Sequence, residues 1–288
     1  MGFFSATSPP SVILPEVSGM RLSAITGNAA PSADVSGATL YLVPFKSGDI
    51  WVPDSGGTWV LRSNTAELSL SLAGTGASVY DVFVWDNAGT LTLKLSTAWT
   101  NDTTRANALT TLNGVKVNGS TEGSMPASRG LHLGRIRAST AFLYDSRASR
   151  HLANTFNALP RPIFQCPNYS DNNATTSYTA PSRTTWGQLD SGQITFVSDG
   201  VSAYDITLAL QASATANFGI SEDSSTTPAV TNQSRDLFLR RTNVLAAGWH
   251  TLRMMYTFSS TFTVYADAAR AGATADPPRT FFQGVMYG

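Results

Sequence analysis

Short apolar runs separated by turn-forming residues constrain the fold of this chain more than any other feature. Runs of about five to eight residues bounded by such turns are typical of antiparallel β-sheets, and they leave no room for long helices. The sequence therefore predicts an all-β protein. Between residues 38 and 137 the turn signals are Gly56-Gly57, Gly74-Thr75-Gly76, Asp86-Asn87-Ala88-Gly89, Asn113-Gly114 and Asn118-Gly119.

Two segments in this region alternate strictly between leucine and a polar residue. In 68–72 and 91–95 every second residue is Leu, so each strand places its leucines on one face. The 288 residues include 33 Ser and 35 Thr, whereas only 13% of the residues are charged. Thr favours strands and Ser favours turns, so the composition agrees with the same β-rich prediction.

The second half of the chain predicts a further β-rich unit, a β-sandwich. Its last predicted strand is too apolar for a solvated tail, and we expect it in the interior of the sandwich. The predicted strands are 193–198, 203–212, 237–240, 248–257, 261–266 and 280–287.

One helix is predicted, over residues 145–157. Ala148, Leu152 and Phe156 recur at intervals of four, which places them on one helical face. The prolines of Pro160-Arg161-Pro162 end such a helix and make a stiff exit. We therefore expect two β-sandwich or barrel-like domains joined by a short helix.

The first 36 residues are rich in proline and small residues, and we expect an extended arm there that attaches to a neighbouring protein. The predicted organisation follows from these boundaries. It comprises an arm over 1–36, a β-domain over 37–144, a linker helix with its Pro-Arg-Pro exit over 145–162, and a C-terminal sandwich over 163–288.

Charge and cysteine content limit the possible partners. The net charge is zero, so no overall field favours nucleic acid. No apolar run reaches the roughly 20 residues of a membrane helix, and no export signal is recognisable, so we expect no membrane insertion. The single cysteine, Cys166, excludes an intrachain disulfide.

No constellation of catalytic residues stands out. The motif Gly-x-Ser-x-Gly is absent, and His132, His151 and His250 lie far apart in the sequence. We interpret Asp81, Asp86 and Glu222-Asp223 as solvated or turn-capping residues, and Asp199-Gly200 as a turn. We therefore predict no enzyme, no catalytic residue, no cofactor and no metal.

Aromatic side chains in loops and at strand ends are the remaining candidates for a binding role, because exposed aromatic rings stack on sugar rings. The candidates for contact with a glycan or with another subunit are Tyr169, Tyr178, Trp186, Trp249 and His250.

Four spaced motifs resemble a module that recurs in structural proteins of tailed bacteriophages. They are the Leu-Tyr-x-x-Pro-Phe opening (40–45), Tyr-Asp-Val-Phe-Val-Trp (80–85), Trp-Thr-Asn-Asp-Thr-Thr-Arg (99–105), and the predicted helix that closes with Pro160-Arg161-Pro162. In addition, Gly-Trp-His-Thr-Leu (248–252) and the terminal Phe-x-Gly strand are similar to the jelly-roll heads of phage fibres and of tumour-necrosis-factor-like trimers.

The resemblance implies a non-enzymatic virion protein, assembled in the host cytoplasm. We expect a short homotrimeric fibre, spike or decoration protein that binds capsid or tail through its N-terminal part and projects its C-terminal sandwich. The alternative is a tail-fibre tip that recognises a host glycan. A glycan-degrading enzyme is a lesser alternative.

Overall fold

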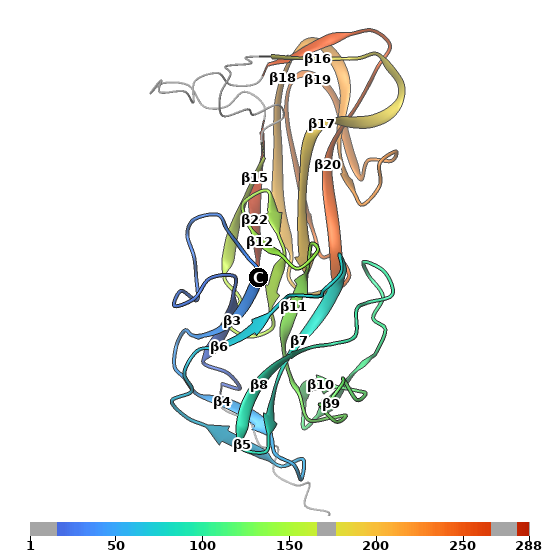
Figure 1. Cartoon of the computed structure of the whole chain (residues 1–288). Coiled ribbons are helices and arrows are strands. Elements are labelled where there is room, and N and C mark those ends of the chain that lie inside the picture. Colours follow the sequence, from blue (N-terminus) through green and yellow to red (C-terminus); the bar gives the residue numbers. More distant parts are fainter. Residues whose placement is uncertain (1–15, 166–176, 266–280, 288) are drawn as a thin grey trace, which may run out of the picture.

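The protein is built from strands throughout the part of the chain that the structure describes. The computed structural model describes residues 16–165, 177–265 and 281–287. All regular elements in these ranges are strands, β1 to β22, which confirms the all-β prediction. The molecule is elongated: a compact N-terminal part lies at one end, and long strands of the C-terminal part extend away from it (Figure 1).

Three small sheets build the N-terminal part. Two of them are short: a three-stranded antiparallel sheet in the order β1-β3-β6 and a hairpin of β4 and β5. The third has six strands in the order β8-β7-β11-β10-β9, with β14 also paired to β11. The bounds are β1 (Met20–Ser23), β3 (Thr39–Pro44), β4 (Ile50–Pro53), β5 (Trp59–Arg62), β6 (Leu68–Ser71), β7 (Val79–Asn87), β8 (Thr90–Leu95), β9 (Leu109–Leu112), β10 (Val115–Asn118), β11 (Leu131–Arg137) and β14 (Leu152–Asn154).

These sheets enclose one apolar core. Strand β7 contributes Tyr80, Val82 and Val84 to it, while the residues between them point to the opposite face, as the period of a strand requires. The predicted strands over 39–45, 68–72, 79–85 and 91–95 are confirmed.

The prediction of an extended arm is wrong for residues 16–36. Strand β1 pairs with β3 in register Leu22 to Leu42, and the Leu22 amide donates to Asn154 Oδ1 at 2.7 Å. Leu22 is fully buried, so the apolar cluster that suggested an attachment segment belongs to the core of its own chain. Residues 1–15, the rest of the predicted arm, lie outside the described residues.

The predicted linking helix is also absent. Residues 143–154 form three short strands, β12 (Leu143–Asp145), β13 (Ser149–Arg150) and β14. A spacing of four is even, so it fits one face of a strand as well as one face of a helix. Non-local pairing decides between the two, because β13 runs parallel to Thr195 and Phe196 and β14 pairs with β11.

An eleven-stranded sheet forms the C-terminal part and continues into the N-terminal part. Its main path runs β15-β22-β18-β20-β17-β13-β12-β2, and β16, β19 and β21 pair beside this path. The bounds are β2 (Val35–Gly37), β15 (Pro160–Gln165), β16 (Ser177–Ala180), β17 (Arg183–Ser198), β18 (Tyr204–Glu222), β19 (Val230–Asn243), β20 (Gly248–Phe258), β21 (Phe262–Tyr265) and β22 (Phe281–Tyr287).

The C-terminal part is β-rich and sandwich-like, and all six strands that the sequence predicts there are present. The terminal strand β22 lies between β15 and β18, and Phe282 and Met286 are buried, so it does lie in the interior. Its Gly284 is required there: a Cβ would come within 2.0 Å of the backbone oxygen of Asp205. The jelly-roll topology stays a prediction.

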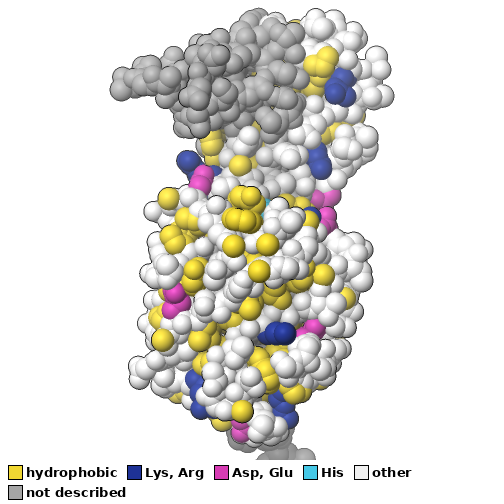
Figure 2. Space-filling model, in the orientation of Figure 1, with side chains coloured by type: hydrophobic (Ala, Val, Ile, Leu, Met, Phe, Trp, Pro, Cys, Tyr) yellow, Lys and Arg dark blue, Asp and Glu magenta, His cyan; other side chains and the backbone are white. Residues whose placement is uncertain are grey.

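The surface reflects the composition. On the face shown in Figure 2, charged side chains are few and separated, and apolar atoms gather over the N-terminal part. This face carries no broad patch of one charge. No helix in the described residues has the length and apolar character to cross a membrane.

Candidate functional site

A buried carboxylate, Asp81, organises a polar site on the face of β7 that points away from the main core. Asp81 is 1% exposed. Its Oδ2 accepts hydrogen bonds from Trp99 Nε1 at 2.9 Å and from Arg105 Nε at 2.8 Å, and Arg105 Nη2 reaches Oδ1 at 3.1 Å. The Arg105 guanidinium also lies 4.5 Å from the centre of the Trp99 ring. The sequence segment from Trp99 to Arg105 therefore wraps around this carboxylate.

A β-bulge brings two residues of β11 to the same carboxylate. The register between β11 and β7 shifts between His132 and Gly134. Residues three apart normally lie on opposite faces of a strand, but the bulge places His132 and Arg135 on one face. His132 Nε2 lies 2.9 Å and Arg135 Nε 3.3 Å from Asp81 Oδ1.

The environment sets the charge of each group. Burial by itself would raise the pKa of Asp81, but hydrogen bonds from His132 and Arg105 hold it well below its ordinary value. Burial lowers the pKa of His132. Neutral His132 donates from Nε2 to Asp81, so its Nδ1 accepts from the Thr155 hydroxyl at 3.0 Å. Burial also lowers the pKa of Arg135 to about 10, so the guanidinium stays charged at neutral pH.

This polar cluster forms the wall of an open recess between the two parts of the molecule. The volume is about 830 Å³. His132 and Arg135 line it from β11, Lys116 lines it from β10, and the turn between β17 and β18 closes the other side. The full lining is Thr103, Thr104, Arg105, Ala106, Ala108, Leu109, Lys116, His132, Arg135, Thr155, Asp199, Gly200, Val201 and Ala247.

The bulge depends on glycine at position 134. A Cβ there would lie 2.2 Å from the backbone oxygen of Ala153, which cannot move without disturbing the pairing of β11 with β14. We predict that Gly134→Ala lowers the free energy of unfolding by about 2–3 kcal/mol. Gly76→Ala is the matched control, because nothing lies within 4 Å of a Cβ at that position. Equal urea midpoints for the two variants would contradict the argument.

A closely packed junction beside the recess joins the two parts of the molecule. The Trp249 amide donates to the Asp102 carbonyl oxygen at 2.8 Å, and Arg137 Nη1 donates to Asp102 Oδ1 at 3.0 Å. The Arg137 guanidinium lies 5.1 Å from the centre of the Trp249 ring, and the His151 ring meets Trp249 edge-on at 4.8 Å. Trp249 is thus a junction residue, in contact on more than one side.

The five predicted contact residues do not gather in one place. Trp249 and His250 begin β20, whereas Trp186 precedes Gly187, which pairs with Tyr256 six residues further along β20. Six residues of strand span about 20 Å. Tyr178 lies in β16, and its side chain is outside the description. Tyr169 lies outside the described residues.

His250 is buried between two acceptors. Its Nδ1 lies 2.7 Å from Asp223 Oδ2, and its Nε2 lies 2.7 Å from the Ala246 carbonyl oxygen. Burial opposes protonation, but these two acceptors raise the pKa of His250 overall. Asp223, interpreted from the sequence as a solvated loop residue, is indeed about half exposed, and it pairs with the buried His250 when His250 is protonated.

The pKa of His151 is shifted in the opposite direction to that of His250. Burial lowers its pKa to about 4. A neutral His151 therefore adds stability above pH 6.5, and this contribution is lost as the pH falls toward 4. We predict that His151→Gln reduces the loss of unfolding free energy between pH 7 and pH 5 by about 1–2 kcal/mol.

His250→Gln is the opposite-sign control for that measurement. Because the folded-state pKa of His250 is raised, its contribution is complete below pH 6.5 and is lost as the pH rises through the folded pKa. Removing it should therefore enlarge the loss between pH 7 and pH 5. Urea denaturation at both pH values measures the loss for each protein, and a change relative to wild type in the same direction for both variants would contradict the assignments.

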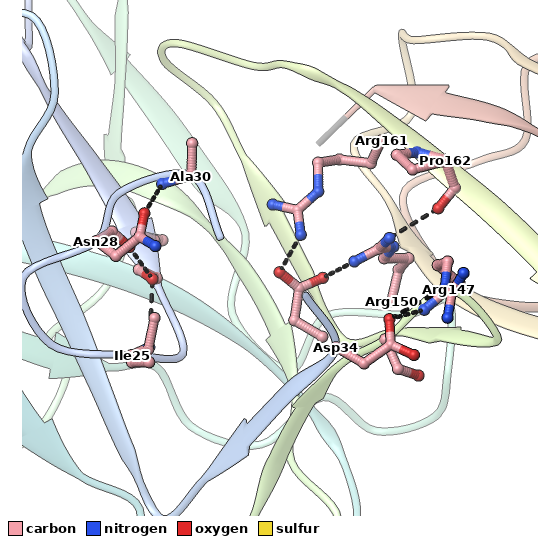
Figure 3. A network of polar contacts seen from close by, with 12 residues as sticks. Ile25, Asn28, Ala30, Asp34, Arg147, Arg150, Arg161 and Pro162 are labelled. Carbon is pink, nitrogen blue, oxygen red and sulfur yellow. Dashed lines mark hydrogen bonds and ion pairs between the residues drawn. The ribbon is translucent and has the colours of Figure 1, made fainter. Parts of the chain in front are cut away.

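A second buried cluster surrounds Asp145. Arg150 Nη1 and Arg161 Nη2 donate to its two oxygens at 2.8 and 2.7 Å, and Arg150 Nη2 also donates to the Pro162 carbonyl oxygen at 2.7 Å. Figure 3 shows Arg150 and Arg161 converging from two sides. Arg21 is buried nearby, and burial together with the charge of Arg161 lowers its pKa to about 10.

Sequence reasoning missed both carboxylates as buried centres. Asp81 was interpreted as solvated, but it is enclosed; the signal was its place inside the apolar run from Val79 to Trp85. Asp199-Gly200 was interpreted as a turn. That is confirmed, since Asp199 Oδ1 accepts from the amides of Val201 and Ser202.

Comparisons with known proteins identify no family. No family model and no curated protein match the chain. Among solved structures it aligns with the insecticidal delta-endotoxin Cry8Ea1 of Bacillus thuringiensis (11% identity, TM-score 0.28, 93% of this chain and 52% of that one). It also aligns with a Cry1Da tryptic core variant of Bacillus thuringiensis (6%, 0.21, 86% and 48%) and with an exo-β-1,3-galactanase of Phanerochaete chrysosporium (9%, 0.20, 95% and 57%).

The chain spans about half the length of the structures that it matches. At TM-scores this low, the likenesses carry no argument about function. Within the described residues, no group of three or more His, Cys, Asp or Glu side chains could hold a metal ion.

Proposed function

We propose that the chain is a non-enzymatic structural protein of a bacteriophage virion. In this proposal the N-terminal part attaches to capsid or tail, and the long-stranded C-terminal part projects from it as a short fibre, spike or decoration. The sequence motifs that resemble phage structural modules support it. The observation that carries it is the elongated build, in which two parts are joined end to end (Figure 1).

Two connections support the rigidity of this build. The large sheet continues from β17 through β13 and β12 into β2, so hydrogen-bonded strands cross from one part into the other. The junction of Trp249 with Asp102, Arg137 and His151 adds packing and a charged contact. A projecting virion part needs such contacts between its two parts to keep a fixed orientation on the particle.

The edge of the large sheet supports self-association. Among the described strands, β19 pairs only with β18, along nearly its whole length of 14 residues. Phe238 on this strand is 77% exposed. Unpaired edge strands with apolar side chains are templates for pairing with another chain, and three copies around an axis would cover each edge. We therefore propose a homotrimer.

Two measurements test these proposals. Density-gradient-purified particles of the phage that encodes the chain should contain it, by mass spectrometry, in stoichiometric amount. Its absence from such particles would refute the virion role. Sedimentation of the purified chain should give three times the monomer mass, and Phe238→Lys should shift the equilibrium toward monomer. A wild-type monomer at micromolar concentration would refute the trimer.

Recognition of a host glycan is a second candidate function. One observation favours it: the recess beside Asp81, which carries three cationic side chains and lies at the base of the projecting part, not at the aromatic residues selected from the sequence. Binding sites commonly form at the interface of two structural units.

A further inference from the structure

We infer that the recess beside Asp81 binds an acidic sugar, whose carboxylate is held by Arg135. This inference deepens the second candidate function, and it rests on that function only for the biological source of the ligand. The recess lies between the two parts of the molecule; the N-terminal part lines it with cationic and hydroxyl side chains, and the C-terminal part adds the carboxylate of Asp199.

Arg135 provides the built anion-binding group. It is 7% exposed and lines the recess, and its Nε has an ion pair with Asp81 but no hydrogen-bond partner. Its terminal nitrogens donate to no described residue. Because Nε is itself enclosed beside Asp81, a ligand in the recess would meet the terminal nitrogens, and a planar carboxylate is the acceptor that matches the geometry of these two donors.

The charge balance favours an anion. Arg105, Lys116 and Arg135 are cationic, whereas Asp81 and Asp199 are the only carboxylates among the residues that line or contact the recess, and His132 is neutral. One positive charge is therefore left over. Asp81 is already occupied by Arg105 and His132, so its charge is divided among several donors and does not fully compensate Arg135.

The size and lining favour a sugar over a bare ion. A volume of about 830 Å³ is within the usual range of small-molecule sites and far exceeds what one inorganic anion fills. Thr103, Thr104 and Thr155 bring hydroxyl groups, and Asp199 brings an acceptor for sugar hydroxyls. A carboxylate at Arg135 with the ring toward the threonines satisfies both kinds of group.

Binding of D-glucuronate to the purified full chain tests this inference. Saturation-transfer NMR and calorimetry at low salt should detect binding of glucuronate, with weaker binding of glucose and of inorganic phosphate. Failure to bind glucuronate at millimolar concentration overturns the inference. Equal affinity for phosphate and glucuronate overturns the assignment of a sugar.

Two variants locate the binding. Arg135→Met should weaken binding by at least about tenfold, the effect of losing charged hydrogen bonds. Because Arg135 is buried, this variant could lose its fold, so the exposed Lys116→Gln is the second variant and should weaken binding several-fold. Lys46→Gln, an equally conservative change at an exposed lysine outside the recess, should bind as the wild type does.

Unchanged affinity in Lys116→Gln together with unchanged affinity in a folded Arg135→Met would place binding elsewhere and overturn the inference. This test uses the isolated chain and does not depend on particles. Absence of the chain from virions would refute the virion role and leave a positive binding result standing.

Discussion

Asp145→Ala should lower the free energy of unfolding by about 3–5 kcal/mol, because removing one partner of a buried ion pair leaves uncompensated charge. Here the imbalance is large: Arg150 and Arg161 would lose their carboxylate, and Arg21 is buried close to both. The cluster joins β12 and β13 to β15, so the connection between the two parts should open first. Urea denaturation at pH 7 gives the value.

Asp34→Ala is the matched control for that variant. Asp34 forms an ion pair with Arg147 in the same region, but both side chains are about half exposed. Exposed pairs contribute about 1 kcal/mol or less, so this variant should be close to wild type. If the two variants lost the same stability, burial of the Asp145 cluster would not be the cause.

Asp81→Ala should also cost about 3–5 kcal/mol, because it leaves Arg105, His132 and Arg135 around an empty position. The sharper test is the double variant with Arg135→Met. Without Asp81 the Arg135 guanidinium is a buried charge that lacks its carboxylate, so removing it as well should restore part of the lost free energy of unfolding. The two changes should therefore be less than additive. Asp205→Ala, which removes an exposed ion-pair partner of Arg240, should have little effect.

Additive losses for Asp81→Ala and Arg135→Met would contradict the described geometry. Asp81 and Arg135 belong to one charge network, and substitutions of residues in contact within such a network show a coupling energy. The same double variant should bind no glucuronate, since the cation that holds the carboxylate is gone.

The strands of both parts were predictable from the sequence because their signals are local. Alternation in 68–72 and 91–95 reports a half-buried strand directly, and glycine and asparagine turns separate one strand from the next. The apolar terminal strand was placed correctly for a similar reason: seven residues containing Phe282 and Met286 have no stable place in solvent.

The helix prediction over 145–157 failed because its deciding contacts are non-local. Arg150 lies within the predicted helix but off its apolar face, yet in the structure it is buried against Asp145 and the carbonyl oxygen of Pro162. Nothing in a window of thirteen residues reveals that Thr195, in a strand much later in the chain, will pair with Ser149. Tertiary context overrides such weak local preferences.

The recess beside Asp81 could not be predicted from the sequence for a different reason, and the contact role of the aromatic candidates stays a prediction. Aromatic residues were selected as binding candidates from their residue type, but Trp249 is occupied by the junction. The recess arises from a one-residue bulge at 133–134, which puts His132 and Arg135 on one face. A change of strand register cannot be read from residue types alone.

Cryo-electron microscopy of the intact particle tests the central claim most directly. The proposal predicts density on the capsid or the tail into which the elongated chain fits, with the N-terminal part against the particle, the β17–β20 strands projecting outward, and three copies around one axis. Well-resolved particles that carry no such density, or that hold the long strands against the particle surface, would contradict it.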